Sequence, residues 1–205
     1  MTGSSRDRIT RTALLIVDLQ NDFLHPDGAY ARGGQSSAAI AALPARIAPL
    51  AQKVRSLGGI VVATQFTLVP GREGEPIISP HLKALRPFLR KGDFAPGSWG
   101  NATVDALQPV DITIEKIAYS AFYMTRLEWV LRKAGIDSLI VGGIVTNGGV
   151  SSTVRDAHVR DLEATVLEDG CAAFSGEVHT TAIAALKPVA RISSVDEVMK
   201  ELGER

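Results

Sequence analysis

The sequence predicts a three-layer α/β/α domain whose central sheet is mostly parallel and has about six strands. Short runs rich in β-branched residues alternate with longer amphipathic stretches, an order typical of parallel sheets with helices on both faces. The run SLIVGGI (138–144) shows no polar alternation, as expected of a strand that is buried on both faces. A chain of 205 residues can bury one sizeable core. We therefore predict a single domain over residues 1–205, of which 1–11 form a flexible N-terminal segment.

Six segments have the length and composition of strands. The first, TALLIVDLQ, is an apolar run that ends in polar residues. The segment Thr67–Asn101 is rich in Pro and Gly, which favours an irregular excursion containing a short helix. The predicted strands are residues 12–20, 59–65, 111–116, 138–144, 163–169 and 191–193.

Helices are expected between these strands. The pattern of Thr125 and Glu128 predicts a capping box at the start of one helix, which Gly135 ends. Ser194 and Glu197 have the same spacing and predict the cap of the last helix. The predicted helices are the second half of 36–59, then 125–135, 150–160 and 177–186, and the segment that follows residue 194.

The composition narrows the classes of partner. Lys and Arg together number 22, as do Asp and Glu, so the formal net charge is zero. This balance disfavours nucleic acids and anionic membranes as partners. No apolar run has the length of a membrane span or the form of a secretory signal, and a single cysteine cannot form an internal disulfide. We expect a cytoplasmic enzyme with no nucleic-acid and no membrane partner.

Three predicted strands end in residues that could perform chemistry. Asp18 follows the first strand, Lys116 ends the third, and the turn 146–149 follows the fourth. If these strand ends meet, Asp18 beside Lys116 could transfer a proton while the N–H groups of the turn hold an oxyanion. A strand-end aspartate is as often a turn or cap residue, so this pattern alone leaves catalysis open.

Several ordered motifs resemble the isochorismatase-like hydrolases, a family that includes nicotinamidases, related amidases and isochorismatases. VDLQNDF, EKIAYSAF, SLIVGGIVTNGGVSSTVRDA and LEDGCAAFSGEVH carry the resemblance, which covers roughly residues 12–190. It implies that Asp18 and Lys116 belong to a catalytic set whose third member, a cysteine in the amidases, is Gly149 here. It also implies a non-proline cis peptide at Val145–Thr146.

Metal ligands of the nicotinamidases are missing from this chain. Those enzymes resemble TQDWH after the second strand, whereas this chain has TQFTL, with Phe66 and Leu68 at the Asp and His positions. Neither side chain can bind a metal ion. We therefore predict no catalytic metal and no other cofactor.

The resemblance offers a precedent for the missing thiol. Isochorismatases keep the Asp and the Lys, have glycine at the cysteine position and hydrolyse a vinyl ether without an acyl-enzyme. By analogy, Asp18 is the general acid, Lys116 tunes it, and the Gly148 and Gly149 N–H groups hold negative charge. The alternatives are an amide or ureide hydrolase whose cysteine at 149 is lost or engineered away, and a non-catalytic small-molecule binder.

The remaining predictions concern the substrate, the other reactive side chains and assembly. Cys171 and the four histidines lack catalytic spacing and are interpreted as structural or surface residues. The apolar residues of the excursion 67–101 predict a homodimer or homotetramer that partly covers it. The residues predicted to bind a small-molecule substrate are Phe23, Gln65, Trp99, Tyr119, Val145, Thr146 and Gly148.

Overall fold

The computed structural model describes residues 9–203, and its centre is a sheet of six parallel strands. The strand order is β3-β2-β1-β4-β5-β6, so the order reverses between β1 and β4. In sheets of this kind, ligands bind beyond the carboxyl ends of the strands at that reversal. The strands are β1 (Thr12–Val17), β2 (Ile60–Phe66), β3 (Ile112–Lys116), β4 (Ser138–Ile144), β5 (Glu163–Ala172) and β6 (Arg191–Ser193).

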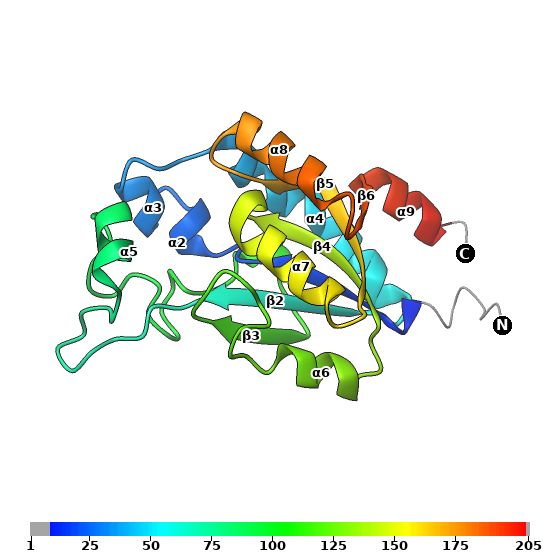
Figure 1. The fold of residues 1–205 in the computed structure, drawn as a ribbon, viewed down its shortest axis with the longest axis horizontal. Helices are drawn as coiled ribbons and strands as arrows, with labels where there is room; N and C mark the ends of the chain where they lie inside the picture. Colours follow the sequence, from blue (N-terminus) through cyan, green and yellow to red (C-terminus); the bar gives the residue numbers. More distant parts are fainter. Residues whose placement is uncertain (1–8, 204–205) are drawn as a thin grey trace.

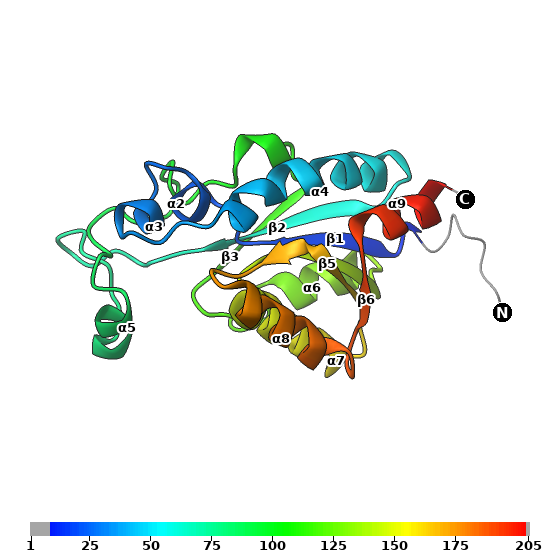
Figure 2. The same ribbon diagram turned by 90° about the horizontal axis from the view of Figure 1, so that it is seen from above.

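Helices cover both faces of the sheet, which confirms the predicted three layers. Helices α4 and α9 lie on one face, and α6, α7 and α8 lie on the other (Figures 1 and 2). Two very short helices, α2 and α3, follow β1. The helices are α2 (Asn21–Leu24), α3 (Ala29–Arg32), α4 (Ala38–Ser56), α5 (Pro80–Leu85), α6 (Leu127–Lys133), α7 (Ser151–His158), α8 (Gly176–Leu186) and α9 (Val195–Gly203).

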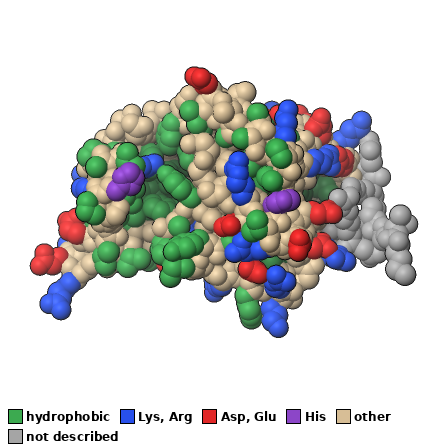
Figure 3. Space-filling model, viewed as in Figure 1, with side chains coloured by type: hydrophobic (Ala, Val, Ile, Leu, Met, Phe, Trp, Pro, Cys, Tyr) green, Lys and Arg blue, Asp and Glu red, His purple; other side chains and the backbone are tan. Residues whose placement is uncertain are grey.

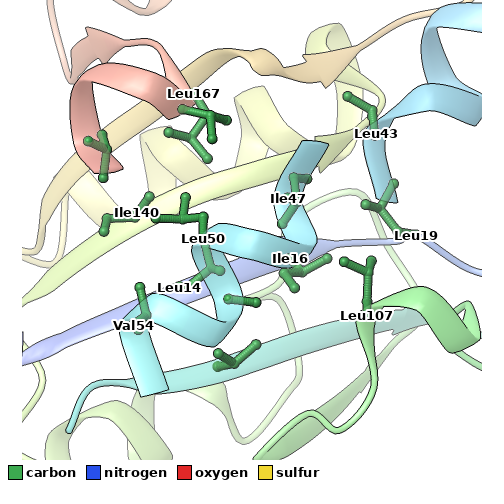
Figure 4. Close-up of a cluster of buried hydrophobic side chains, with 14 of the residues drawn as sticks. Leu14, Ile16, Leu19, Leu43, Ile47, Leu50, Val54, Leu107, Ile140 and Leu167 are labelled. Carbon is green, nitrogen blue, oxygen red and sulfur yellow. The ribbon is translucent and has the colours of Figure 1, made fainter. Parts of the chain in front are cut away.

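Each face of the sheet has its own apolar core. In β1, Leu14 and Ile16 pack against α4, whereas Leu15 and Val17 belong to the core under α6 and α7. Figure 4 shows the first core, in which Ile47 and its neighbours on α4 lie over the strands. Because β1 is buried on both faces, all six of its residues are buried and it carries no polar alternation.

Helix α4 is longer than the sequence predicted. It runs from Ala38 to Ser56 and contains Pro44 and Pro49, although we expected only its second half to be helical. A proline inside a helix removes one backbone hydrogen bond. Ile40, Leu43, Ile47, Leu50 and Val54 recur at helical spacing and are all buried, so packing on the sheet outweighs the lost hydrogen bonds.

One of the two predicted capping boxes is wrong. Helix α6 begins at Leu127, and its amide donates to the Thr125 hydroxyl, while the Glu128 carboxylate accepts from Arg132 and Arg160 instead. Arg132 and Arg160 therefore bind the carboxylate that the capping box predicted to accept a bond at the start of the helix.

The capping box of the last helix is confirmed. The Glu197 amide donates to the Ser194 hydroxyl at 3.1 Å, and the Glu197 carboxylate accepts from the Ser194 amide at 3.0 Å. This reciprocal pair fixes the start of α9.

The excursion 67–101 leaves the sheet after β2 and returns beside it. Both of its ends are held by Gln20, whose side chain bonds the backbone of Phe66 and the carbonyl of Asn101. The excursion contains the predicted short helix, α5, none of whose residues is buried. Its other anchor is a small aromatic core that includes Phe94 and Leu68.

The chain's first residues only partly test the predicted flexible segment 1–11. Residues 1–8 lie outside the described residues. Ile9 is buried in the core and Arg11 pairs with Asp137, so residues 9–11 belong to the packed domain. Within 9–203, none of the helices is both long and apolar enough to span a bilayer.

Candidate active site

A buried ion pair stands at the carboxyl ends of the strands. Lys116 Nζ lies 2.6 Å from Asp18 Oδ2, and both side chains are almost fully buried. The two residues come from β3 and from the end of β1, which are not adjacent, because β2 lies between them. Asp18 has a φ of +56°, in the left-handed region that few residues other than glycine adopt. Such backbone conformations cluster at functional sites.

The intervening strand β2 adds a third residue to the Asp18–Lys116 pair, and this residue was not predicted from the sequence. Thr64 of β2 is fully buried, and its hydroxyl donates to Asp18 Oδ1 at 2.6 Å. The same hydroxyl accepts from the Asp18 amide at 3.1 Å. Lys116 is fixed in turn, since its Nζ donates to the carbonyl of Ala118 at 2.9 Å. The carboxylate therefore has one oxygen held by Thr64 and the other facing Lys116.

The turn after β4 differs in two ways from the predicted one. The non-proline cis peptide joins Ile144 to Val145, one bond earlier than the Val145–Thr146 bond that the resemblance implied. A π-helical turn, η2 (Thr146–Val150), then leads into α7. Within it, the Gly148 N–H donates to the Val145 carbonyl at 2.9 Å. The Gly148 N–H is therefore already engaged, which corrects its predicted role as an oxyanion donor.

Gly149 lies directly against the ion pair. A Cβ atom added to it would stand 3.3 Å from Asp18 Oδ2 and 3.1 Å from a methyl group of Val17. It would also meet the Ile144 carbonyl oxygen at 2.8 Å, a distance that requires the backbone to shift. The position thus faces the carboxylate, as a nucleophile would, but the turn as built accommodates only glycine.

A histidine that was predicted to be a surface residue supports this turn. His179 of α8 places Nδ1 2.8 Å from the Thr146 hydroxyl, which is fully buried. Ser151 donates to the Thr146 carbonyl from the other side. Thr146 is therefore a structural anchor of the turn and does not line the cavity.

A cavity of about 530 Å³ opens above the ion pair. Hydrophobic side chains gather around a hollow on the side of the molecule where α3 and α5 lie (Figure 3). The predicted site residues that line the cavity are Asp18, Phe23, Lys116, Tyr119, Val145 and Gly149.

Four other predicted site residues do not line it. Trp99 packs edge-on against His25 and is 54% exposed on the surface. Gln65 belongs to β2, but its neighbours Thr64 and Phe66 are the residues that approach the site. Thr146 and Gly148 lie within the turn and are not among the residues that line the cavity.

Much of the wall comes from residues outside the predicted substrate-binding set. Tyr30 stacks on Phe174 with ring centres 5.4 Å apart and an angle of 10°. Arg86, at the end of α5, donates from Nε to the Tyr30 hydroxyl at 2.8 Å. Burial raises the pKa of Tyr30, and its bond to Arg86 only partly opposes this rise. The further lining residues are Phe66, His81, Leu82, Leu85, Leu89, Phe94, Ile117, Ala118, Asn147, Ser175 and Val178.

Cys171 does not line the cavity. It is buried among the apolar residues under α7 and α8, and its thiol lies 3.8 Å from the Val141 carbonyl. Burial raises the pKa of Cys171 to about 12, so the thiol is neutral at physiological pH. Neither the place nor the ionisation suits a nucleophile.

The residues at the expected metal positions have structural roles. Leu68 is buried in the aromatic core of the excursion, and the Phe66 ring lies 5.5 Å from Lys116 Nζ. Over residues 9–203 there is no group of three or more His, Cys, Asp or Glu side chains that could hold a metal ion. The side chains present therefore do not fit the metal site of the nicotinamidases.

Comparisons with known proteins agree on the family. Residues 12–197 match the isochorismatase domain. The chain is 36% identical over 188 residues to the ureidoacrylate amidohydrolase RutB of Methylobacterium radiotolerans, covering 86% of this chain and 73% of the relative. It is 35% identical to the RutB of Pantoea ananatis, over 78% of this chain and 68% of the relative.

Solved structures show the same fold. A cysteine hydrolase from Pseudomonas syringae pv. phaseolicola superposes with a TM-score of 0.81 at 24% identity, over 96% of this chain and 94% of the other. A pyrazinamidase/nicotinamidase from Streptococcus mutans gives a TM-score of 0.72 at 26% identity, over 89% and 99%. With the domain match and the shared fold, the chain belongs to the isochorismatase family of hydrolases.

Proposed function

We propose that this hydrolase acts on a small metabolite without a thiol nucleophile, using Asp18 as its acid and base and Lys116 as the partner of that carboxylate. The observation that carries the proposal is the buried Asp18–Lys116 pair, which borders the cavity beside a glycine. A carboxyl group that faces both an ammonium and a substrate cavity is suited to proton transfer. Vinyl-ether hydrolysis needs only a group that transfers a proton and space for the substrate beside it, and it needs no thiol.

The steps follow from the positions of the two groups. The pair holds a proton at Lys116 Nζ, which can pass over 2.6 Å to Asp18 Oδ2 and from there to the terminal vinyl carbon. The electron pair of the C=C bond forms the new C–H bond, and the ether oxygen stabilises the resulting cation. Water adds to the cationic carbon and returns a proton to Asp18. The hemiketal then breaks its C–O bond to give a ketone and an alcohol.

Gly149 keeps the space beside Asp18 Oδ2 free for the substrate. Since a Cβ atom would stand 3.3 Å from that oxygen, any side chain here would lie between the carboxyl group and the reacting carbon. Gly149 therefore contributes by its lack of a side chain, and its N–H is the one we retain as a donor to developing negative charge.

Hydrolysis of a C–N bond is the second candidate. The curated relatives at 36% and 37% identity are ureidoacrylate amidohydrolases, which favours an amide or ureide substrate. In this chain Asp18 would have to activate water directly, because Gly149 offers no thiol and Cys171 is buried elsewhere. A family member that binds its ligand without turning it over is the third alternative.

We also propose a cytoplasmic homodimer or homotetramer, in which a second copy covers part of the excursion. Val69 and Ile77 are 44% and 69% exposed there, more than a free apolar side chain favours. Sedimentation at micromolar concentration tests this, and a monomer contradicts it.

The reaction is tested by a substrate panel assayed by NMR with purified protein treated with EDTA. The panel contains isochorismate as the vinyl ether, ureidoacrylate and small ureides as C–N substrates, and nicotinamide. We expect turnover of the vinyl ether that chelation does not reduce. Turnover of the C–N substrates alone would favour the second candidate, and activity lost on chelation and restored by zinc or iron would refute the metal-free route.

A matched pair of substitutions tests the role of the glycine. Gly149→Ala and Gly149→Cys both introduce the Cβ atom that meets the Ile144 carbonyl, and only the second adds a thiol. We expect both variants to lose vinyl-ether hydrolysis to a similar degree. If Gly149→Cys gains C–N hydrolysis and Gly149→Ala does not, Gly149 marks a lost nucleophile and the thiol-free mechanism is wrong.

A further inference from the structure

The charged side chains that line the cavity do not balance. Asp18 and Lys116 neutralise one another at the floor. Arg86 also lines the cavity, and within residues 9–203 no carboxylate lies within 4.0 Å of its guanidinium. A guanidinium is charged at every physiological pH, so this cavity carries one positive charge that the protein does not compensate.

The protein holds this charge in a fixed position instead of neutralising it. The Nε of Arg86 donates to the Tyr30 hydroxyl at 2.8 Å, and Tyr30 is itself fixed by its stacking on Phe174. Burial by itself lowers the pKa of Arg86, but bonds to the hydroxyl groups of Tyr30 and Tyr119 outweigh it and raise that pKa. Both partners are hydroxyl groups and not carboxylates, so they orient the guanidinium and leave its charge available.

We infer that Arg86 forms an anion subsite and that the substrate carries a carboxylate, which Arg86 binds while the reacting bond lies against Asp18. The part of this inference that concerns the reacting bond rests on the proposed function. The guanidinium has five N–H donors, and its two terminal nitrogens can bind both oxygens of a carboxylate. A single fixed guanidinium matches one negative charge, which favours a carboxylate over a phosphate dianion.

The wall between the two ends fits a flat, unsaturated body. Tyr30 and Phe174 present parallel rings beside Arg86, and Phe23 and Phe66 continue the aromatic lining toward the floor. Aromatic faces pack well against planar conjugated groups. The substrate class is therefore a small conjugated carboxylate whose cleavable bond lies at the end away from the carboxylate that Arg86 binds.

Binding of three probes that the enzyme need not turn over tests the inference. We would titrate trans-cinnamate, the uncharged trans-cinnamamide and phenyl phosphate by ligand-observed NMR. A charge-assisted hydrogen bond pair predicts that cinnamate binds about 10- to 100-fold more tightly than cinnamamide. Arg86→Gln should remove that preference. Arg90→Gln is the matched control, since it makes the same charge change on an exposed arginine that does not line the cavity.

The possible outcomes separate the anion subsite from the proposed reaction. Equal binding of cinnamate and cinnamamide, an equal loss in Arg86→Gln and Arg90→Gln, or tighter binding of phenyl phosphate would each overturn the inference. Circular dichroism of both variants shows whether they are folded, and Tyr30→Phe, which should weaken cinnamate binding several-fold, tests the subsite if Arg86→Gln is not. If the cinnamate pattern holds and no panel substrate is hydrolysed, the proposed function fails while the subsite stands.

Discussion

The floor and the roof of the cavity are built differently. The floor, which we define as Asp18, Thr64 and Lys116, consists of strand ends. All three side chains are buried, and the Asp18 carboxylate is bonded to both of the others. The roof, defined as α5 with Arg86, has no buried residue in its helix. Rigid positions suit proton transfer, and exposed segments suit the recognition of variable ligands. We therefore expect the catalytic rate to depend on the floor and the substrate affinity on the roof.

The largest expected effect is on the floor. Asp18→Asn should lower kcat by about 10²- to 10⁴-fold, because the amide cannot deliver or accept the proton. Its KM should change little, since the roof is intact. Stopped assays on the best substrate of the panel measure both constants. Asp105→Asn, a substitution of an exposed carboxylate outside the cavity, is the control and should match the native enzyme.

Thr64→Val should have the second largest effect. The substitution conserves shape and removes the hydroxyl that donates to Asp18 Oδ1 at 2.6 Å. A hydrogen bond to a charged group is worth about 1.5–3 kcal/mol, which corresponds to a roughly 10- to 100-fold loss in kcat. Thr113→Val, on the neighbouring strand β3, is the control. A native pH–rate profile and a native kcat in Thr64→Val would show that Thr64 does not position the carboxylate.

The different predictability of floor and roof has a physical cause. Asp18 and Lys116 could be predicted because parallel strands bring their carboxyl ends to one edge, whatever the details of packing. Thr64 and Arg86 could not, because their bonds to Asp18 and Tyr30 join positions 46 and 56 residues apart. No local pattern encodes such contacts.

The fold and the turn after β4 also differ in how far they could be predicted from the sequence. The strand–helix alternation follows from local periodicity, and the strands and helices were predicted in the right order. The role of His179 depends on how α8 packs over the turn, which periodicity does not specify. Glu128 has the spacing of a cap, but two arginines in space decide its partners.

A roof substitution should affect affinity and leave the rate unchanged. Leu82 lines the cavity from α5 and is only partly buried in the aromatic core of the excursion. Leu82→Ala removes apolar contact with the ligand worth on the order of 1 kcal/mol, so KM should rise by about fivefold at constant kcat. Glu73→Ala, at an exposed position on the same excursion that does not line the cavity, should change neither constant. A fall in kcat with unchanged KM would contradict the division between floor and roof.

The smallest expected effect is at Cys171, which belongs to neither floor nor roof. Its thiol is fully buried, and burial raises its pKa from 9.0 to about 12. Iodoacetamide should therefore leave the native enzyme unlabelled and active at pH 7–9, and Cys171→Ala should keep the native kcat. Rapid labelling with loss of activity, measured by mass spectrometry beside the assay, would make Cys171 a displaced nucleophile.

The same thiol predicts how stability depends on alkaline pH. The native state holds the proton up to about pH 12, whereas the unfolded thiol releases it near pH 9.0, so the unfolded state binds fewer protons between these values. The contribution of the thiol to stability is complete below pH 9.0 and is lost as the pH rises toward 12. Urea denaturation of the native protein and of Cys171→Ala at pH 7, 9 and 10 should give curves that converge as the pH rises. A difference in unfolding free energy that stays constant over this range would show that the Cys171 thiol does not ionise differently in the two states.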